Sequence, residues 1–274
     1  MAAHSVGLAT SIIFGGVAAA SVLGVPLGAL IGDYAGWRWA FAGMALFSAL
    51  VLALHLAVIP GLPVTSSVTM RQFAQQLGSR KLQVGLLLTL ALVAGHFMLF
   101  TYVRPLLMSV SGFDSQWVSA LLFAYGFAGI VGNFLAGVIA ARRTARTLLA
   151  ISTGLLLTPV LFLLIGNSNL GGGMLLLVWG LAYGGVSVGL MTWMMKAAPG
   201  AVEVATALYV GVFNVAIALG AWAGGLVLDK VGLTGNLWLA AGFATIALLL
   251  ALGICLAEHR AANADVDSPP LQCQ

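Results

Sequence analysis

One histidine lies deep within a long apolar stretch of this sequence. His96 falls in residues 83–103, which contain no Asp, Glu, Lys or Arg. An imidazole carries or releases a proton near neutral pH, and a titratable group at membrane depth is a functional candidate by default. The alternative is a neutral histidine that hydrogen-bonds to a neighbouring helix. Both readings stay open for His96, whereas the structural one is favoured for His55, near the end of its own stretch.

Aromatic and amide side chains in the other apolar stretches are of the types that would form a cavity around His96. Aromatic rings stack on flat ligands, and amides hydrogen-bond to hydroxyl or ring atoms, so this chemistry suits a sugar or a base. Each residue alone is more often packing or interhelical hydrogen bonding, and only the set indicates a cavity. The candidate substrate-binding residues are His96, Tyr125, Asn133, Trp179, Tyr183 and Asn214.

A second pattern could do different chemistry. Gly185-Val-Ser187-Val-Gly189 matches the nucleophile elbow of serine hydrolases, and with His96 it would define an intramembrane serine hydrolase. The elbow requires a strand–turn–helix context, and Ser187 lies in an apolar stretch rich in small residues, so close helix packing is favoured. We therefore predict that the chain is not an enzyme. Cys255 and Cys273 show no metal-ligand or disulfide spacing, and we expect neither a metal nor a cofactor.

The composition predicts what surrounds these residues. Hydrophobic residues make up 61% of the chain and charged residues 7%, which indicates a protein in contact with the lipid bilayer. Each apolar stretch is close to the ~20 residues that a helix needs to cross a membrane. Backbone groups in lipid must be paired within the segment, which favours helices. We predict an all-α membrane protein with eight transmembrane helices, at about 7–31, 39–59, 83–103, 117–140, 147–165, 173–193, 205–228 and 236–256.

The basic residues predict the orientation. With the N-terminus in the cytoplasm, eight lie in inside loops: Arg71, Arg80, Lys81, Arg142, Arg143, Arg146, Lys196 and Arg260. Three lie in outside loops: Arg38, Arg104 and Lys230. This excess on the inside places both termini in the cytoplasm. It also explains the net charge of +4 without a nucleic-acid partner.

The chain contains one stretch twice. Gly15, Gly24, Gly28, Asp33 and Gly36 recur 196 residues later as Gly211, Gly220, Gly224, Asp229 and Gly232. Each copy is followed by another apolar stretch, so the repeat is a two-span unit. Glycines four residues apart, continued by Gly32 in the first copy, form a flat ridge against which a second helix packs closely. Pro26 removes a backbone donor and predicts a bend in the first span.

The repeat predicts the domain organisation. Spans one and two match spans seven and eight, so the repeating unit is six spans and a complete pair has twelve. Twelve helices in two six-span halves is the plan of the major facilitator superfamily. On that plan the chain represents spans five to twelve. Residues 1–59 would be the last two spans of the first bundle and 60–82 a central cytoplasmic loop with a short surface helix from Met70 to Leu77. Residues 83–257 would form a complete second bundle, and 258–274 a disordered cytoplasmic tail.

Specific motifs support a resemblance to this superfamily. Gly24-Val-Pro26-Leu-Gly28, followed by Gly32-Asp33, resembles the fifth-span signature of drug:proton antiporters, with the proline displaced by one residue. The segment with Gly137, Arg142, Arg143 and Arg146 resembles the family's cytoplasmic gate loop, with Ala141 where the family has an acidic residue. Residues 100–105, 179–193 and 213–225 resemble the sugar and purine-nucleoside efflux branch, the arabinose efflux permease-like proteins.

The resemblance implies a secondary transporter that exports sugars, purine nucleosides or drugs by alternating access. Its partners would be the small-molecule substrate and protons, and its location the bacterial inner membrane. The first four spans would be encoded upstream or supplied by another chain. A non-transporting truncated fragment remains the alternative to the transporter, beside the serine hydrolase.

Overall fold

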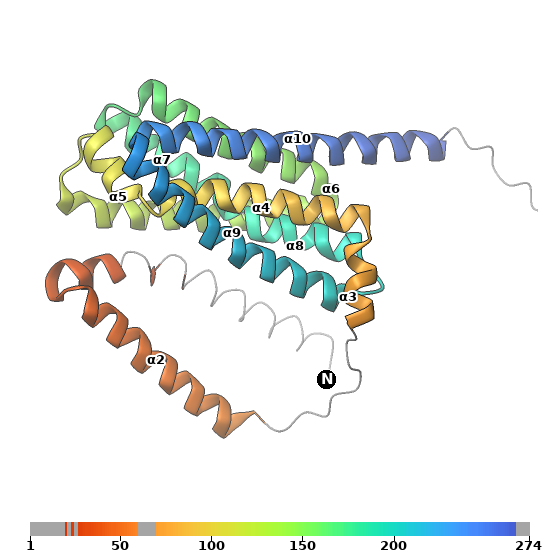
Figure 1. Cartoon of the computed structure of the whole chain (residues 1–274), viewed down its shortest axis with the longest axis horizontal. Coiled ribbons are helices and arrows are strands. Elements are labelled where there is room, and N and C mark those ends of the chain that lie inside the picture. Colours follow the sequence, from red (N-terminus) through yellow and green to blue (C-terminus); the bar gives the residue numbers. More distant parts are fainter. Residues whose placement is uncertain (1–19, 21–22, 25–26, 60–69, 267–274) are drawn as a thin grey trace, which may run out of the picture.

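The computed structural model describes residues 20, 23–24, 27–59 and 70–266, with side chains up to residue 260. Every regular element in these residues is a helix, which confirms the all-α prediction (Figure 1). Residues 27–35 are helical and precede α2. The elements that follow are α2 Trp37–Val58, α3 Met70–Leu77, α4 Arg80–Phe100, α5 Val103–Pro105, the π-helix η1 Leu106–Val110, α6 Ser115–Ile165, α7 Asn169–Gly184, α8 Val186–Ala197, α9 Val202–Val231 and α10 Leu233–Val266.

Six helical segments of the described residues are long and apolar enough to span a membrane, with α7 and α8 counted together. One of them, α6, has 51 residues and would be about 77 Å long if straight, more than twice the ~30 Å hydrocarbon core. Its backbone leaves helical geometry at Arg143 (φ −136°, ψ 60°), so α6 contains two of the predicted spans. The first predicted span lies mostly outside the described residues, and the count of eight stays a prediction.

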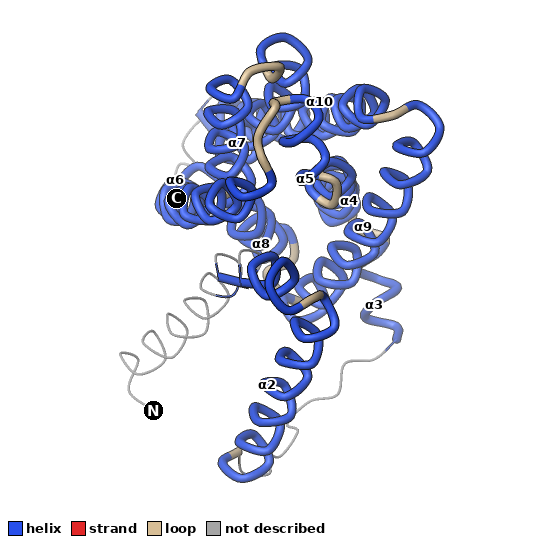
Figure 2. The backbone as a smooth tube through the Cα atoms, turned by 90° about the vertical axis from the view of Figure 1, so that its left-hand side faces the viewer, coloured by secondary structure: helices blue, strands red, loops and turns tan. Residues whose placement is uncertain are grey.

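The helix α4 lies at the centre of the packed region. It contacts α9, α10 and α8, while α6 packs against α7, α8 and α10. In α4, 72% of the most apolar 18-residue segment is buried, whereas none of the corresponding segment of α2 is buried. Both views show α2 apart from the other helices (Figures 1 and 2). The core therefore forms from α4 to α10, and α2 has no buried residue in the part of the chain that the structure describes.

The second copy of the glycine ridge forms a close helix contact. A Cβ atom at Gly220 would overlap the backbone of Ala94, and one at Gly224 the backbone of Met98. The absence of side chains therefore lets α9 lie directly on α4. In the first copy, by contrast, Gly24, Gly28 and Gly32 have no described atom within 4 Å of a Cβ position. Pro26 and its predicted bend lie outside the described residues.

The repeat is also present in the backbone. Gly36 (φ 92°) and Gly232 (φ 84°) occupy the same repeat position, and each separates two helices. The amide of Gly36 donates to the Gly32 carbonyl at 3.2 Å, and that of Gly232 to the Leu228 carbonyl at 3.0 Å. Gly32 and Leu228 are also 196 residues apart. Both copies thus end in the same turn, at a φ angle that glycine adopts without strain.

Two predictions made for the ends of helices had different outcomes. The short helix expected within the central loop is present as α3. The tail expected to be disordered from residue 258 instead begins as helix, because α10 continues to Val266. Ala257, Ala261, Ala262 and Ala264 are strong helix formers, and the prediction read the polar residues between them as a loop. Residues 267–274 lie outside the description.

Candidate functional site: an aromatic cluster around His96

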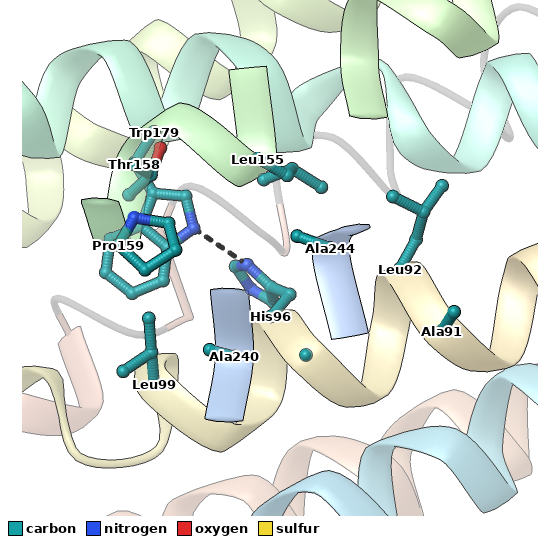
Figure 3. Close-up of a pocket in the computed structure, with 11 residues that line it drawn as sticks. Ala91, Leu92, His96, Leu99, Leu155, Thr158, Pro159, Trp179, Ala240 and Ala244 are labelled. Carbon is teal, nitrogen blue, oxygen red and sulfur yellow. Dashed lines mark hydrogen bonds between the residues drawn. The ribbon is translucent and has the colours of Figure 1, made fainter. Parts of the chain in front are cut away.

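His96 is buried where α4 meets α6, α7 and α10, with 4% of its surface exposed. Its Nδ1 accepts a hydrogen bond of 3.0 Å from the indole Nε1–H of Trp179 on α7 (Figure 3). A cavity of ≈10 Å³ adjoins the pair and is lined by residues of α4, α6, α7 and α10, among them Pro159 and Ala244. This volume holds about one water molecule, so the cluster is closed in this conformation.

Four rings form a continuous stack through His96. Tyr125 stacks on Phe100 with ring centroids 4.9 Å apart, and Phe100 stacks on His96 at 5.1 Å. His96 also stacks on Tyr183, with ring centroids 3.4 Å apart and an interplanar angle of 9°. The indole of Trp179 stands edge-on to three of these rings, at 5.4 Å from His96, 5.9 Å from Phe100 and 5.8 Å from Tyr125. We call these five residues the aromatic cluster.

Helix geometry explains why these side chains meet. His96 and Phe100 are four residues apart on α4, and Trp179 and Tyr183 are four apart on α7, so each pair shares one helix face. Tyr125 joins them because α6 and α7 touch through their backbones. A Cβ atom at Gly180 would overlap the Tyr125 backbone, and one at Gly184 the Gly129 backbone. The glycines set the distance between helices at which the rings come into contact.

Two polar atoms of the aromatic cluster are buried without a hydrogen-bond partner among the described residues. They are Nε2 of His96 and the hydroxyl oxygen of Tyr125. Because Nδ1 accepts from Trp179, the neutral imidazole carries its proton on Nε2, which is therefore an unused donor. A buried polar group without a partner costs about 1–3 kcal/mol. A ligand that reached these two atoms would recover that free energy.

The two candidate asparagines do not join the aromatic cluster. Asn214 on α9 is exposed, and its Nδ2 donates to the Val210 carbonyl of its own helix at 2.8 Å. Asn133 is partly exposed and lies eight residues beyond Tyr125, about 12 Å along α6. The structure thus brings together four of the six predicted site residues. It adds Phe100, whose spacing of four from His96 was a signal that the sequence analysis did not use.

The predicted gate loop lies at the bend in α6. Arg142, Arg143 and Arg146 are exposed there, and Gly137 lies just before them. Lys196 of α8, which was not among the predicted site residues, donates to the Ala141 carbonyl at 3.1 Å and to the Thr144 hydroxyl at 2.8 Å. The backbone of Ala141 therefore provides an acceptor where its side chain has no acidic group. Lys196 of α8 thus hydrogen-bonds to the backbone of a different helix, at the bend in α6.

The structure shows no hydrogen bond between Ser187 and His96, the pair that the hydrolase alternative would use. Ser187 is exposed at the start of α8, and its carbonyl accepts from the Tyr209 hydroxyl at 3.5 Å. His96 is buried and bonded to Trp179. Of the repeated aspartates, Asp33 pairs with Arg104 at 3.0 Å, whereas Asp229 has no ion pair with a described residue.

Apolar helices long enough to cross a membrane, packed around one buried imidazole, define a polytopic α-helical membrane protein. The sequence matches the family profile of the Major Facilitator Superfamily over residues 1–209. Because this match covers most of the chain, the protein belongs to that superfamily. Its members are secondary transporters and generally not enzymes.

Proposed function

We propose that the protein is part of a proton-coupled exporter of small polar organic solutes or drugs, with the aromatic cluster as its substrate site. The observation that carries the proposal is the hydrogen bond from Trp179 to Nδ1 of His96. It joins α4 to α7 through the one ionisable side chain that the apolar stretches of the second bundle contain. A titratable side chain at membrane depth is the kind of group that relays protons in transporters.

The hydrogen-bond chemistry couples a proton to movement. Neutral imidazole accepts from the indole, but doubly protonated imidazole has two donors and no acceptor. Indole N–H is also only a donor, so a proton on Nδ1 of His96 would break its bond to Trp179. Substrate polar groups then become the preferred partners of His96. A proton on Nδ1 of His96 and the hydrogen bond from Trp179 are thereby alternatives at one atom, and loss of that bond would let α4 separate from α7 and His96 bind substrate.

Alternating access requires two bundles that move relative to one another. No described residue packs within 4 Å of the Cβ positions of Gly24, Gly28 and Gly32, and α2 has no buried residue, which supports the proposal that further spans pack there. These would be the first four spans, encoded upstream or provided by another chain, with both termini of the present chain in the cytoplasm of a bacterial cell. None of the eight predicted spans contains an Asp or Glu, so a proton-binding carboxylate would also come from the added spans.

The test uses a twelve-span fusion, with the first four spans of a full-length member of the superfamily placed before this chain. We expect the fusion, in proteoliposomes with an imposed pH gradient, to drive flux of a labelled pentose, a nucleoside or a cationic dye. The matched variant is His96→Gln, whose side-chain oxygen still accepts from Trp179 but does not titrate. We expect it to lose the gradient dependence of flux while reaching the membrane in normal amounts.

Three results would contradict the proposal or a part of it. Absence of flux from a correctly inserted fusion would favour the non-transporting fragment. Gradient-driven flux by the 274-residue chain alone would show that no further spans are needed. Normal coupled export by His96→Gln would return His96 to a structural role.

A further inference from the structure

Phe100 is the middle ring between His96 and Tyr125, each of which has a buried polar atom without a hydrogen-bond partner among the described residues. It stacks on His96 at 5.1 Å and on Tyr125 at 4.9 Å, with interplanar angles of 21° and 29°. Its neighbours are 4% and 8% exposed, whereas Phe100 itself is only partly buried. The phenyl ring therefore shields the unused Nε2 of His96 and hydroxyl of Tyr125 without offering a hydrogen bond to either.

Phe100 lies close to a break in the backbone. Phe100 is the last residue of α4, and the chain departs from helical geometry two residues later at Tyr102 (φ −112°, ψ 25°). The Tyr102 hydroxyl donates to the Ala221 carbonyl of α9 at 3.0 Å and fixes the far side of this break. Pro105 has no amide hydrogen to donate to the carbonyl four residues before it. The helical geometry of α4 thus ends close to Phe100 and beyond the turn that contains His96.

We infer that Phe100 occupies the place of a ligand ring, and that the aromatic cluster binds a planar heteroaromatic compound that displaces it. The incoming ring would stack between His96 and Tyr125 in place of the phenyl group. A ring nitrogen or carbonyl of the ligand would accept from Nε2–H of His96, and a second polar atom would pair with the Tyr125 hydroxyl. The inference rests on the proposed substrate site and specifies its ligand class.

The exchange explains why a heteroaromatic ring would be chosen over an aliphatic solute. A flat ring replaces both stacking contacts that Phe100 gives up, and its edge satisfies two polar atoms that the phenyl ring leaves unpaired. A pentose without a base restores the hydrogen bonds but not the stacking. The site should therefore discriminate by the ring, with Phe100 competing against the ligand.

The experiment measures binding to the purified chain in nanodiscs by calorimetry, with adenosine as the flat heteroaromatic probe and ribose as its non-aromatic counterpart. We expect adenosine to bind and ribose to bind at least tenfold more weakly. Phe100→Ala removes the competing ring and should tighten adenosine binding about three- to tenfold. Tyr125→Phe should weaken it about fivefold by removing one hydrogen bond. Phe97→Ala is the matched control, because Phe97 contacts His96 edge-on and separates no unpaired atoms.

If Phe100→Ala does not fold, Phe100→Leu keeps apolar volume without stacking and should change affinity in the same direction. Equal or weaker adenosine binding by the Phe100 variants, or an equal gain in Phe97→Ala, would overturn the inference. So would equal binding of ribose and adenosine. Adenosine binding without flux through the twelve-span fusion would contradict the proposed transport but not the binding of a heteroaromatic ring in place of Phe100. Gradient-driven ribose flux without adenosine binding would support transport and contradict the heteroaromatic ligand.

Discussion

The carboxylate of Asp33 accepts a hydrogen bond from the guanidinium of Arg104 at 3.0 Å, across 71 residues of sequence. Asp33 belongs to the helix before α2, and Arg104 to the short α5 that follows α4. Both side chains are more than two-fifths exposed, so the pair contributes at most about 1 kcal/mol. Its importance is positional, since it joins the region around α2 to the packed helices.

The pair can be tested by cross-linking. In a background with Cys255 and Cys273 changed to serine, Asp33→Cys combined with Arg104→Cys should react with a short bifunctional maleimide within one chain. We expect a faster-migrating band on a denaturing gel, because the two side chains lie within hydrogen-bonding distance. Each single-cysteine variant serves as the control and should give no such band. No intramolecular product from the double variant would contradict the arrangement of Asp33 beside α5.

Orientation in the membrane gives a second prediction. Asp114 and Arg142 are both exposed and lie at opposite ends of the first half of α6. In the same cysteine-free background, Asp114→Cys in intact cells should react with a membrane-impermeant maleimide, whereas Arg142→Cys should react only after the cells are opened. The reverse pattern would place both termini outside.

The hydrogen bond between His96 and Trp179 predicts an effect on stability. Trp179→Phe keeps an aromatic ring but leaves Nδ1 of His96 without its donor, and we expect a loss of about 1–3 kcal/mol. His96→Gln retains an acceptor for the indole and should cost less. Thermal unfolding in detergent, followed by the reactivity of Cys255 with a thiol-sensitive dye, measures both variants. Equal stability of Trp179→Phe and wild type would mean that the bond adds nothing to the fold.

The two glycine ridges predict opposite outcomes for one substitution. Gly220→Leu forces a side chain into the α4 backbone and should destabilise the chain by at least about 1–3 kcal/mol. Gly24→Leu meets no described atom within 4 Å, and its effect on the isolated chain should be close to zero. The same detergent unfolding assay compares them. In the twelve-span fusion, Gly24→Leu should become as harmful as Gly220→Leu, and a harmless result there would argue against added spans on this ridge.

Much of the fold could be predicted because hydropathy reports burial in a bilayer directly. The apolar stretches gave the helices, and the basic segment from Arg142 to Arg146 marked the break inside α6. The alanine-rich start of the tail was misread because its polarity outweighed its helix propensity. Hydropathy and charge patterns were thus sufficient for the helices and for the break in α6. They failed in the tail, where helix propensity outweighed polarity.

The site was harder to predict because hydropathy says little about the direction in which a side chain points. Asn214 looked like a ligand-binding amide, yet it bonds within its own helix. Phe100 entered the sequence analysis only as part of the motif 100–105, although its spacing of four from His96 places it in the ring stack. Contacts such as Lys196 to Ala141 depend on how separate helices pack, which no single stretch of sequence encodes.

The two hydrogen bonds from Lys196 to Ala141 and Thr144 have a consequence for the order in which the protein folds. Ala141 and Thr144 leave the ribosome more than 50 residues before Lys196. The two halves of α6, which form a hairpin around this bend, must therefore enter the membrane before the lysine that binds the bend has been made. The bend in α6 is therefore shaped first by local sequence and fixed only after α8 has been inserted. Translation that stops between these segments would leave a loosely folded hairpin, open to the proteases and chaperones that survey nascent membrane chains.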